Sequence, residues 1–276
     1  MPRFDLHSHS TASDGLLAPK ALVAHAIARG VDVLALTDHD DTAGLAEAAQ
    51  AAHGTPLTLI NGVELSTSWE THTLHIVALN IDPANETLGA GLTHIRTGRD
   101  ARAHRIAAAL AAVGIRGAYE GARRFVTSDR LISRSHFARY LVEAGYAKTT
   151  QDVFKRYLVA GKPGYVTHTW ASVTDAVSWI HAAGGQAVLA HPGRYRVTAT
   201  GMRRMLTDFR EAGGDAIEVY TPSHTYAQAE EYGGYARTFG FLASTGSDYH
   251  GPGEGSLDLG SVPPLPSWLT PVWSRW

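Results

Sequence analysis

Residues 4–9 read Phe-Asp-Leu-His-Ser-His, a strand-like stretch that ends in two histidines at alternate positions. Successive side chains of a β-strand point to opposite faces, so residues two apart point the same way. His7 and His9 can therefore reach one ion where the strand ends, while the alternate positions face an apolar interior. Asp14 follows five residues after His9 and adds a carboxylate. The stretch predicts a buried strand that opens into a metal site.

The same pattern recurs along the chain, where apolar runs are followed directly by side chains of the types that bind metal. A single histidine near a strand end is usually an ordinary hydrogen-bonded residue. Six histidines and three carboxylates in this arrangement instead indicate a metal cluster. Residues 73–79 form a further run with His75 inside it, and the other runs precede Thr37-Asp38-His39, Asn61-Gly62-Val63-Glu64, His191-Pro192-Gly193 and Gly246-Ser247-Asp248-Tyr249-His250.

Length and composition favour one large enzyme-like domain with an elaboration. The chain has 276 residues, of which 44% are hydrophobic, enough to bury a substantial core. Its net charge of −2 excludes the extended basic surface that duplex nucleic acid requires, but leaves a mononucleotide or a short single strand open. Cysteine is absent, so nitrogen and oxygen must hold any metal. Without a signal-like start or a run of about 20 apolar residues, we expect a cytoplasmic protein that does not bind membranes.

Strand-like runs alternate with helical patterns over most of the chain. Repeated βα units imply a parallel sheet with right-handed crossovers. In a closed barrel of this type, functional groups gather at the C-terminal ends of the strands, where the candidate ligands lie. Glu218 and His224 end or follow another such run, and we interpret them as structural. The predicted helices cover residues 19–29, 42–52, 172–183, 201–212 and 226–239.

One stretch breaks this alternation. From about Gly98 to Leu158 only helical patterns appear, over residues 99–113, 119–125, 135–144 and 150–158. Nine of the chain's twenty arginines, Arg130 among them, lie between Arg99 and Arg139. We expect residues 1–98 and 159–276 to form a discontinuous barrel and residues 99–158 an inserted helical subdomain that binds substrate.

Helical phase indicates which of these arginines matter. At about 100° per residue, Arg99 and Arg102 lie within roughly 60° of each other, on the apolar side of their helix. They are therefore expected to face the barrel mouth, with His104 and Arg105 flanking that face. Arg134 precedes a predicted helix N-terminus, where backbone amides favour anions. The alternative is that these arginines are ordinary solubilising charges.

The ordered set of motifs resembles the polymerase and histidinol phosphatase (PHP) family, from residue 3 to about residue 255. The helical insertion and the Arg-x-x-Arg at Arg102 and Arg105 resemble the branch that includes nucleoside 3′,5′-bisphosphate phosphatases and 5′–3′ exoribonucleases. The motifs that carry the family resemblance are His7-x-His9, Asp14, Thr37-Asp38-His39, Glu64, His75, Ala190-His191-Pro192 and Gly246-Ser247-Asp248-x-His250.

The resemblance implies an α/β fold, a distorted (β/α)7 TIM-like barrel that holds two or three divalent metals. Mixed imidazole and carboxylate ligation suits Mn²⁺, which we expect, and also Fe²⁺ or Zn²⁺. The implied ligand sets are His7, His9, Glu64 and Asp248 for one metal, Asp14, His39 and His250 for a second, and Glu64, His75 and His191 for a third, with Glu64 as the bridge.

The expected reaction is hydrolysis of the 3′-phosphate of a nucleoside 3′,5′-bisphosphate, giving the nucleoside 5′-monophosphate and phosphate. A metal-bound hydroxide would attack phosphorus while positive groups neutralise the phosphate oxygens. Arginines would clamp the second phosphate with paired N–H groups. The expected catalytic residues are Glu64, His191 and Asp248, and the expected substrate contacts are Asp14, Arg99, Arg102, His104, Arg105 and Arg134.

Several alternatives share part of this pattern. A 5′–3′ exonuclease acting on short RNA would use the same metals, and a histidinol-phosphate phosphatase would not need the arginine-bearing insertion. A metal-dependent amidohydrolase commonly bridges its metals with a modified lysine, but none of the chain's four lysines ends a buried strand. A non-catalytic, metal-stabilised regulatory module is the alternative from a different class, and the complete ligand set argues against it.

Overall fold

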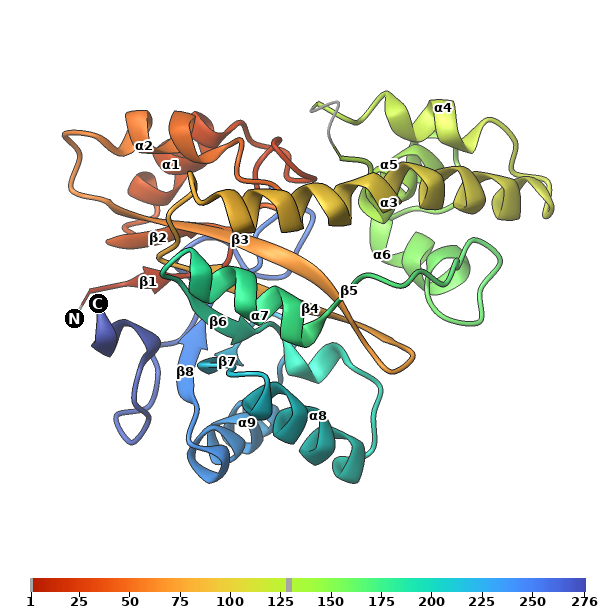
Figure 1. The fold of residues 1–276 in the computed structure, drawn as a ribbon. Coiled ribbons are helices and arrows are strands. Elements are labelled where there is room, and N and C mark those ends of the chain that lie inside the picture. Colours follow the sequence, from red (N-terminus) through yellow and green to blue (C-terminus); the bar gives the residue numbers. More distant parts are fainter. Residues whose placement is uncertain (1, 128–130) are drawn as a thin grey trace.

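The structure, a computed structural model, describes residues 2–127 and 131–276. A strongly curved sheet forms its centre (Figure 1). The strands are paired in the order β1-β2-β3-β4-β6-β7-β8, and the short β5 pairs with β3. Their bounds are β1 Phe4–Asp5, β2 Val33–Leu36, β3 Thr58–Trp69, β4 His72–Leu79, β5 Ala171–Ser172, β6 Gln186–Leu189, β7 Ala216–Tyr220 and β8 Leu242–Thr245.

The chain segments that follow β1 and β8 bring the two ends of the sheet together. The Leu6 N–H donates to the Thr245 carbonyl at 3.1 Å, and the His9 N–H donates to the Tyr249 carbonyl at 2.8 Å. Ser8 and Tyr249 form a parallel bridge between the same segments. The seven strands thus nearly close into a barrel, which confirms the predicted TIM-like α/β fold class.

The sheet is mixed, so the prediction of a parallel sheet is wrong at one strand. β4 runs antiparallel to both β3 and β6. Only Glu70 and Thr71 separate β3 from β4, and so short a connection can join only antiparallel neighbours, because a parallel pair needs a long crossover. His75 therefore enters the barrel from within a reversed strand, not from a C-terminal strand end.

Helices cover the sheet on separate flanks (Figure 1). α1 and α2 pack with β2 around one hydrophobic cluster, whereas α7, α8 and α9 pack against another. None of the described helices is long and apolar enough to cross a membrane. The helices are α1 Pro19–Ala28, α2 Leu45–Ala52, α3 Glu86–Ala111, α4 Ala118–Arg123, α5 Arg134–Glu143, α6 Thr150–Val153, α7 Val173–Ala182, α8 Ala199–Glu211 and α9 Tyr226–Phe239, with a π-helical turn at Phe154–Leu158 and 3-10 turns at Pro192–Arg194 and Val272–Arg275.

The long helix α3 links the barrel to a helical lobe (Figure 1). It begins at Glu86 rather than at Arg99, because the Asn85 side chain caps it by accepting the Leu88 N–H at 3.0 Å. Its C-terminal part packs with α4, α5 and α6 around a hydrophobic cluster of their own. The domain boundaries at residues 98/99 and 158/159 stay a prediction, and Arg130 lies outside the described residues.

Gly246 allows the segment after β8 to approach β1. A Cβ at this position would lie 2.3 Å from the His7 Cβ and 2.7 Å from the His7 backbone nitrogen. We therefore expect Gly246→Ala to lower the free energy of unfolding by about 1–3 kcal/mol, measured by denaturant titration. The control is Gly234→Ala in α9, where a Cβ meets nothing within 4 Å and where alanine should stabilise the helix by about 0.5–1 kcal/mol. Undiminished stability of the Gly246 variant would contradict this close approach.

Candidate metal centre

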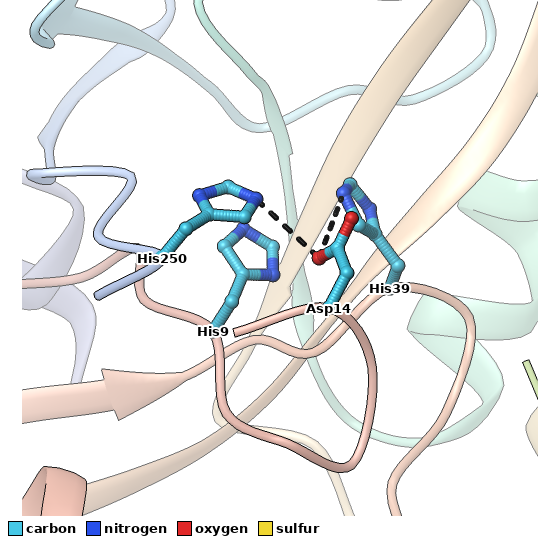
Figure 2. Close-up of side chains that lie close together, drawn as sticks. All are labelled: His9, Asp14, His39 and His250. Atoms are coloured by element: carbon cyan, nitrogen blue, oxygen red, sulfur yellow. Dashed lines mark ion pairs between the residues drawn. The ribbon is translucent and has the colours of Figure 1, made fainter. Parts of the chain in front are cut away.

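The nine predicted ligands gather at one mouth of the barrel. Eight of them fall into three groups whose ligand atoms lie within 4.8 Å of one another, and the ninth, His191, contacts the same cluster through Glu64. Figure 2 shows the first of these groups. The groups are His9, Asp14, His39 and His250; His7, His9, Glu64 and Asp248; and His39, Glu64 and His75.

Glu64, in the middle of β3, occupies the centre of the cluster and is fully buried. Its Oε2 lies 3.2 Å from His7 Nε2 and 2.9 Å from His39 Nδ1. Its Oε1 lies 2.8 Å from His75 Nδ1 and 3.1 Å from His191 Nε2. His9 Nε2 also lies 3.3 Å from Oε2, so each oxygen faces a different set of histidines, which is the position expected of a bridging ligand.

Asp14 anchors the group shown in Figure 2. Its Oδ1 lies 3.4 Å from His250 Nε2 and 3.9 Å from His39 Nε2. Its Oδ2 accepts a hydrogen bond of 2.8 Å from the Ser133 hydroxyl, the N-cap of α5. The helical lobe therefore holds one oxygen of Asp14 and leaves the other directed at the histidines.

His191 and Asp248 both adopt left-handed backbone conformations, with φ values of 31° and 47°. Non-glycine residues rarely adopt such values, and those that do are concentrated at functional sites. Asp248 Oδ1 lies 3.4 Å from His7 Nε2 and 3.2 Å from His9 Nε2. The unusual backbone thus directs the carboxylate to the pair of histidines after β1.

Orphaned buried atoms show that the cluster fits divalent cations. His7 Nε2, Asp14 Oδ1 and Glu64 Oε2 are buried and have no hydrogen-bond partner among the described residues. Buried polar atoms nearly always have such a partner, so convergent lone pairs of this kind need another one. Imidazole nitrogens and carboxylate oxygens are ligands that Mn²⁺, Fe²⁺ and Zn²⁺ accept.

The electrostatics of the cluster favour cations. Burial, together with the neighbouring His250 and His39, lowers the pKa of His9 to about 3, so its ring is neutral at pH 7, the form that binds metal. Burial also disfavours protonation of His7, but Glu64 and the other nearby carboxylates outweigh it and raise the pKa of His7. The same carboxylates attract a metal ion, so protons and metal compete for this site.

Glu218, which the sequence analysis interpreted as structural, contacts two of the candidate ligands. Its Oε1 lies 2.7 Å from His7 Nδ1, and its Oε2 accepts the His191 backbone N–H at 2.6 Å. A carboxylate on Nδ1 fixes the tautomer of His7 and directs Nε2 toward Glu64. In sequence the only signal was its place at the end of an apolar run, which a structural carboxylate shares.

Three predicted substrate contacts lie in positions that do not favour that role. Arg99 is buried and bonded to the Asp40 carboxylate and, at 2.9 Å, to the Ser66 hydroxyl, so its guanidinium is already occupied. His104 is 60% exposed and stacks on Tyr119 in the helical lobe. Arg105 donates to His168 Nδ1 at 3.1 Å. We therefore assign Arg99 to positioning, because it joins α3 to the residue after His39. The exposed His104 and Arg105 lie on the lobe.

Arg102 and Arg134 differ from Arg99 because neither forms an ion pair with a carboxylate in residues 2–127 and 131–276. Arg102 is only 8% exposed, and its Nε has no hydrogen-bond partner among the described residues. Burial and the nearby Arg134 lower the pKa of Arg102 to about 9, so it stays charged at pH 7. Burial also lowers the pKa of Arg134, which interacts electrostatically with Asp14. The pair thus carries positive charge that no direct ion pair with a carboxylate of the described residues neutralises.

A nearly closed α/β barrel with a carboxylate-bridged histidine cluster at its mouth defines a metal-dependent hydrolase. The chain belongs to the PHP domain family, whose model matches residues 5–168. It is 50% identical to a 3′,5′-nucleoside bisphosphate phosphatase of Chromobacterium violaceum, over 99% of this chain and 96% of the relative. It is 44% identical to the 5′-3′ exoribonuclease Rnm of Escherichia coli, over 99% of this chain and 93% of the relative.

Solved structures agree with this assignment. A C. violaceum protein described as an amidohydrolase with bound sulfate and no metal superposes with a TM-score of 0.95 at 49% identity, over 99% of this chain and 95% of the other. A predicted metal-dependent phosphoesterase of Bifidobacterium adolescentis gives a TM-score of 0.85 at 28% identity, over 98% and 93% of the two chains. The two sequence relatives and the B. adolescentis protein are thus described as enzymes that cleave phosphate esters, whereas the C. violaceum structure is described as an amidohydrolase.

Loss of the Glu218 charge should weaken the metal centre without unfolding the barrel. We expect Glu218→Gln to lower the affinity for Mn²⁺ about 10–100-fold, the range for partners of metal-ligating histidines, in a calorimetric titration. The matched control is Glu211→Gln at the exposed end of α8, which should bind Mn²⁺ like the unmodified protein. Equal affinities for both variants would mean that Glu218 does not orient His7.

Proposed function

We propose that the chain is a metal-dependent phosphatase that removes the 3′-phosphate of nucleoside 3′,5′-bisphosphates. The observation that carries this proposal is the pair Arg102 and Arg134, which forms no ion pair with a carboxylate of the described residues and lies beside a cluster of nine ligand-type side chains. Such a cluster takes one phosphate, and the two guanidinium groups take the other. The 50% identical phosphatase of C. violaceum supports the same substrate class.

The nine ligands would hold two or three divalent cations, for which we propose Mn²⁺. When bound, such cations would neutralise phosphate oxygens and lower the pKa of a coordinated water to about 7. In this proposal Glu64 would be the ligand shared between the cations, while His191 and Asp248 would border the reacting phosphate. Asp14 links the centre to the helical lobe through Ser133.

The lobe would fix the distance between the two phosphate subsites. Arg102 lies over the Trp170 ring, 5.2 Å from its centroid, and Arg134 is the first residue of α5. The N-terminus of α5 adds the positive end of its helix dipole to the positive charge of the arginines. Because Arg99 and Asp40 bind α3 to the barrel, the arginines are held at a fixed position relative to the metal centre.

Exoribonuclease action on short RNA is the second candidate. The exposed stack of His104 on Tyr119, with ring centroids 3.9 Å apart, offers a surface on which a further base can stack. The relative Rnm, at 44% identity, carries that activity. A longer substrate would extend from the metal centre along α3 toward this pair.

A parallel assay distinguishes the two candidates. The Mn²⁺-loaded protein is given adenosine 3′,5′-bisphosphate in one reaction and a 5′-phosphorylated trinucleotide in another. We expect free phosphate and adenosine 5′-monophosphate from the first, at the higher kcat/KM. Mononucleotides released from the trinucleotide, without phosphate from the bisphosphate, would favour the exoribonuclease. Inactivity on both substrates with Mn²⁺, Fe²⁺, Zn²⁺ and Mg²⁺ would refute both.

The arginine pair should matter only for substrates with a second phosphate. Arg102→Ala and Arg134→Ala are each expected to cost about 1.5–3 kcal/mol in kcat/KM for the bisphosphate, the range for hydrogen bonds to charged groups. A nucleoside 3′-monophosphate should be barely affected. The control is Arg116→Ala, at an exposed position between α3 and α4. Equal losses on both substrates would show that the pair holds the reacting phosphate or only the fold.

A further inference from the structure

The turn after β6 is built to a fixed shape. Gly193 comes so close to His224 that a Cβ would lie 2.6 Å from the His224 Cδ2. The Gly193 N–H also donates to His224 Nε2 at 2.9 Å, and His224 Nδ1 donates to the Val219 carbonyl at 2.8 Å. His224 therefore ties the Pro192–Arg194 turn to the end of β7, which fixes where the Arg194 side chain begins.

The Arg194 guanidinium shares Asp248 with the metal centre. Its Nη2 pairs with Asp248 Oδ2, whereas Asp248 Oδ1 faces the ring nitrogens of His7 and His9 at 3.4 and 3.2 Å. One carboxylate thus contacts the candidate metal site through one oxygen and a cation through the other. The guanidinium is held directly beside the cluster.

Arg194 is also open to solvent, unlike Arg99, which pairs with a buried carboxylate near the site as well. Its side chain is 44% exposed although that of its partner Asp248 is 2% exposed. The Arg99 side chain, by contrast, is 6% exposed and is bonded to both Asp40 and Ser66. A guanidinium has five N–H donors, and the contact with Asp248 leaves most of those of Arg194 available for a ligand.

We propose that Arg194 donates hydrogen bonds to non-bridging oxygens of the reacting phosphate, as a further catalytic residue; this inference rests on the proposed phosphatase function. In the hydrolysis, a water oxygen forms a bond to phosphorus and the bond from phosphorus to the 3′-oxygen breaks. The water gives up a proton, and the leaving oxygen takes one to become the hydroxyl group. Arg194 transfers no proton, because arginine stays protonated, and it stabilises the negative charge on phosphate.

This role separates Arg194 from the pair Arg102 and Arg134. Those two would bind the second phosphate, so their loss should spare monophosphates. Arg194 lies on the metal side and should affect every substrate, because each presents a reacting phosphate there.

The test compares Arg194→Ala and Arg194→Lys with Arg196→Ala, an exposed arginine two residues further along the chain. Bound metal, calorimetric binding of inorganic phosphate to the Mn²⁺-loaded protein, and kcat for mono- and bisphosphates are measured. We expect Arg194→Ala to keep its metal, to bind phosphate about 10–100-fold more weakly and to lose kcat on both substrates. Added guanidinium should restore part of the activity, and Arg194→Lys should retain less than the native residue. The Arg196 variant should behave like the unmodified protein.

Two results would overturn the inference. Phosphate binding and kcat within about threefold of the unmodified protein would mean that Arg194 makes no contact, since a lost hydrogen bond to a charged group costs more than that. Loss of metal in parallel with activity would mean that Arg194 only positions Asp248. If the unmodified protein binds phosphate through Arg194 yet hydrolyses no bisphosphate, the proposed function fails while the contact itself stands.

Discussion

The site depends on the interaction between the buried carboxylate of Glu64 and the histidines that surround it. A charge removed from water is costly unless it is paired. Burial acts to raise the pKa of Glu64, but His39, His7 and His75 outweigh it and hold the pKa well below its usual range. The carboxylate stays ionised because strands and strand ends from across the barrel direct imidazoles at both of its oxygens. Closure of the barrel and the reversed β4 serve this convergence.

Much of this arrangement could be predicted from the sequence, because strand geometry is local. The period of two in an extended chain places His7 and His9 on one side, and the strand-end pattern brings distant ligands to one mouth. The direction of β4 could not be predicted in this way, because apolar runs look alike in parallel and antiparallel strands. The role of Glu218 could not be predicted for a related reason: it depends on His7, more than two hundred residues away in the chain.

The arginines show the limit of helical phase. Helical phase places Arg99 and Arg102 on one side of α3, but it does not distinguish their roles. Arg99 pairs with Asp40 and positions α3, whereas the Arg102 Nε has no partner among the described residues and can bind an anion. Exposure likewise separates Arg194 from Arg99, although both pair with buried carboxylates. Such differences depend on neighbours that approach from other strands. Membership of the PHP domain family fixes the class of chemistry, and these tertiary contacts decide which phosphate ester fits.

Diffraction from crystals soaked with Mn²⁺, recorded at the manganese absorption edge, tests the central role of Glu64 most directly. If Glu64 bridges the centre, anomalous peaks will adjoin both of its carboxylate oxygens, one beside His7 and His39 and another beside His75 and His191. Manganese bound elsewhere, or at a single position that touches only one oxygen of Glu64, would contradict a carboxylate-bridged metal centre.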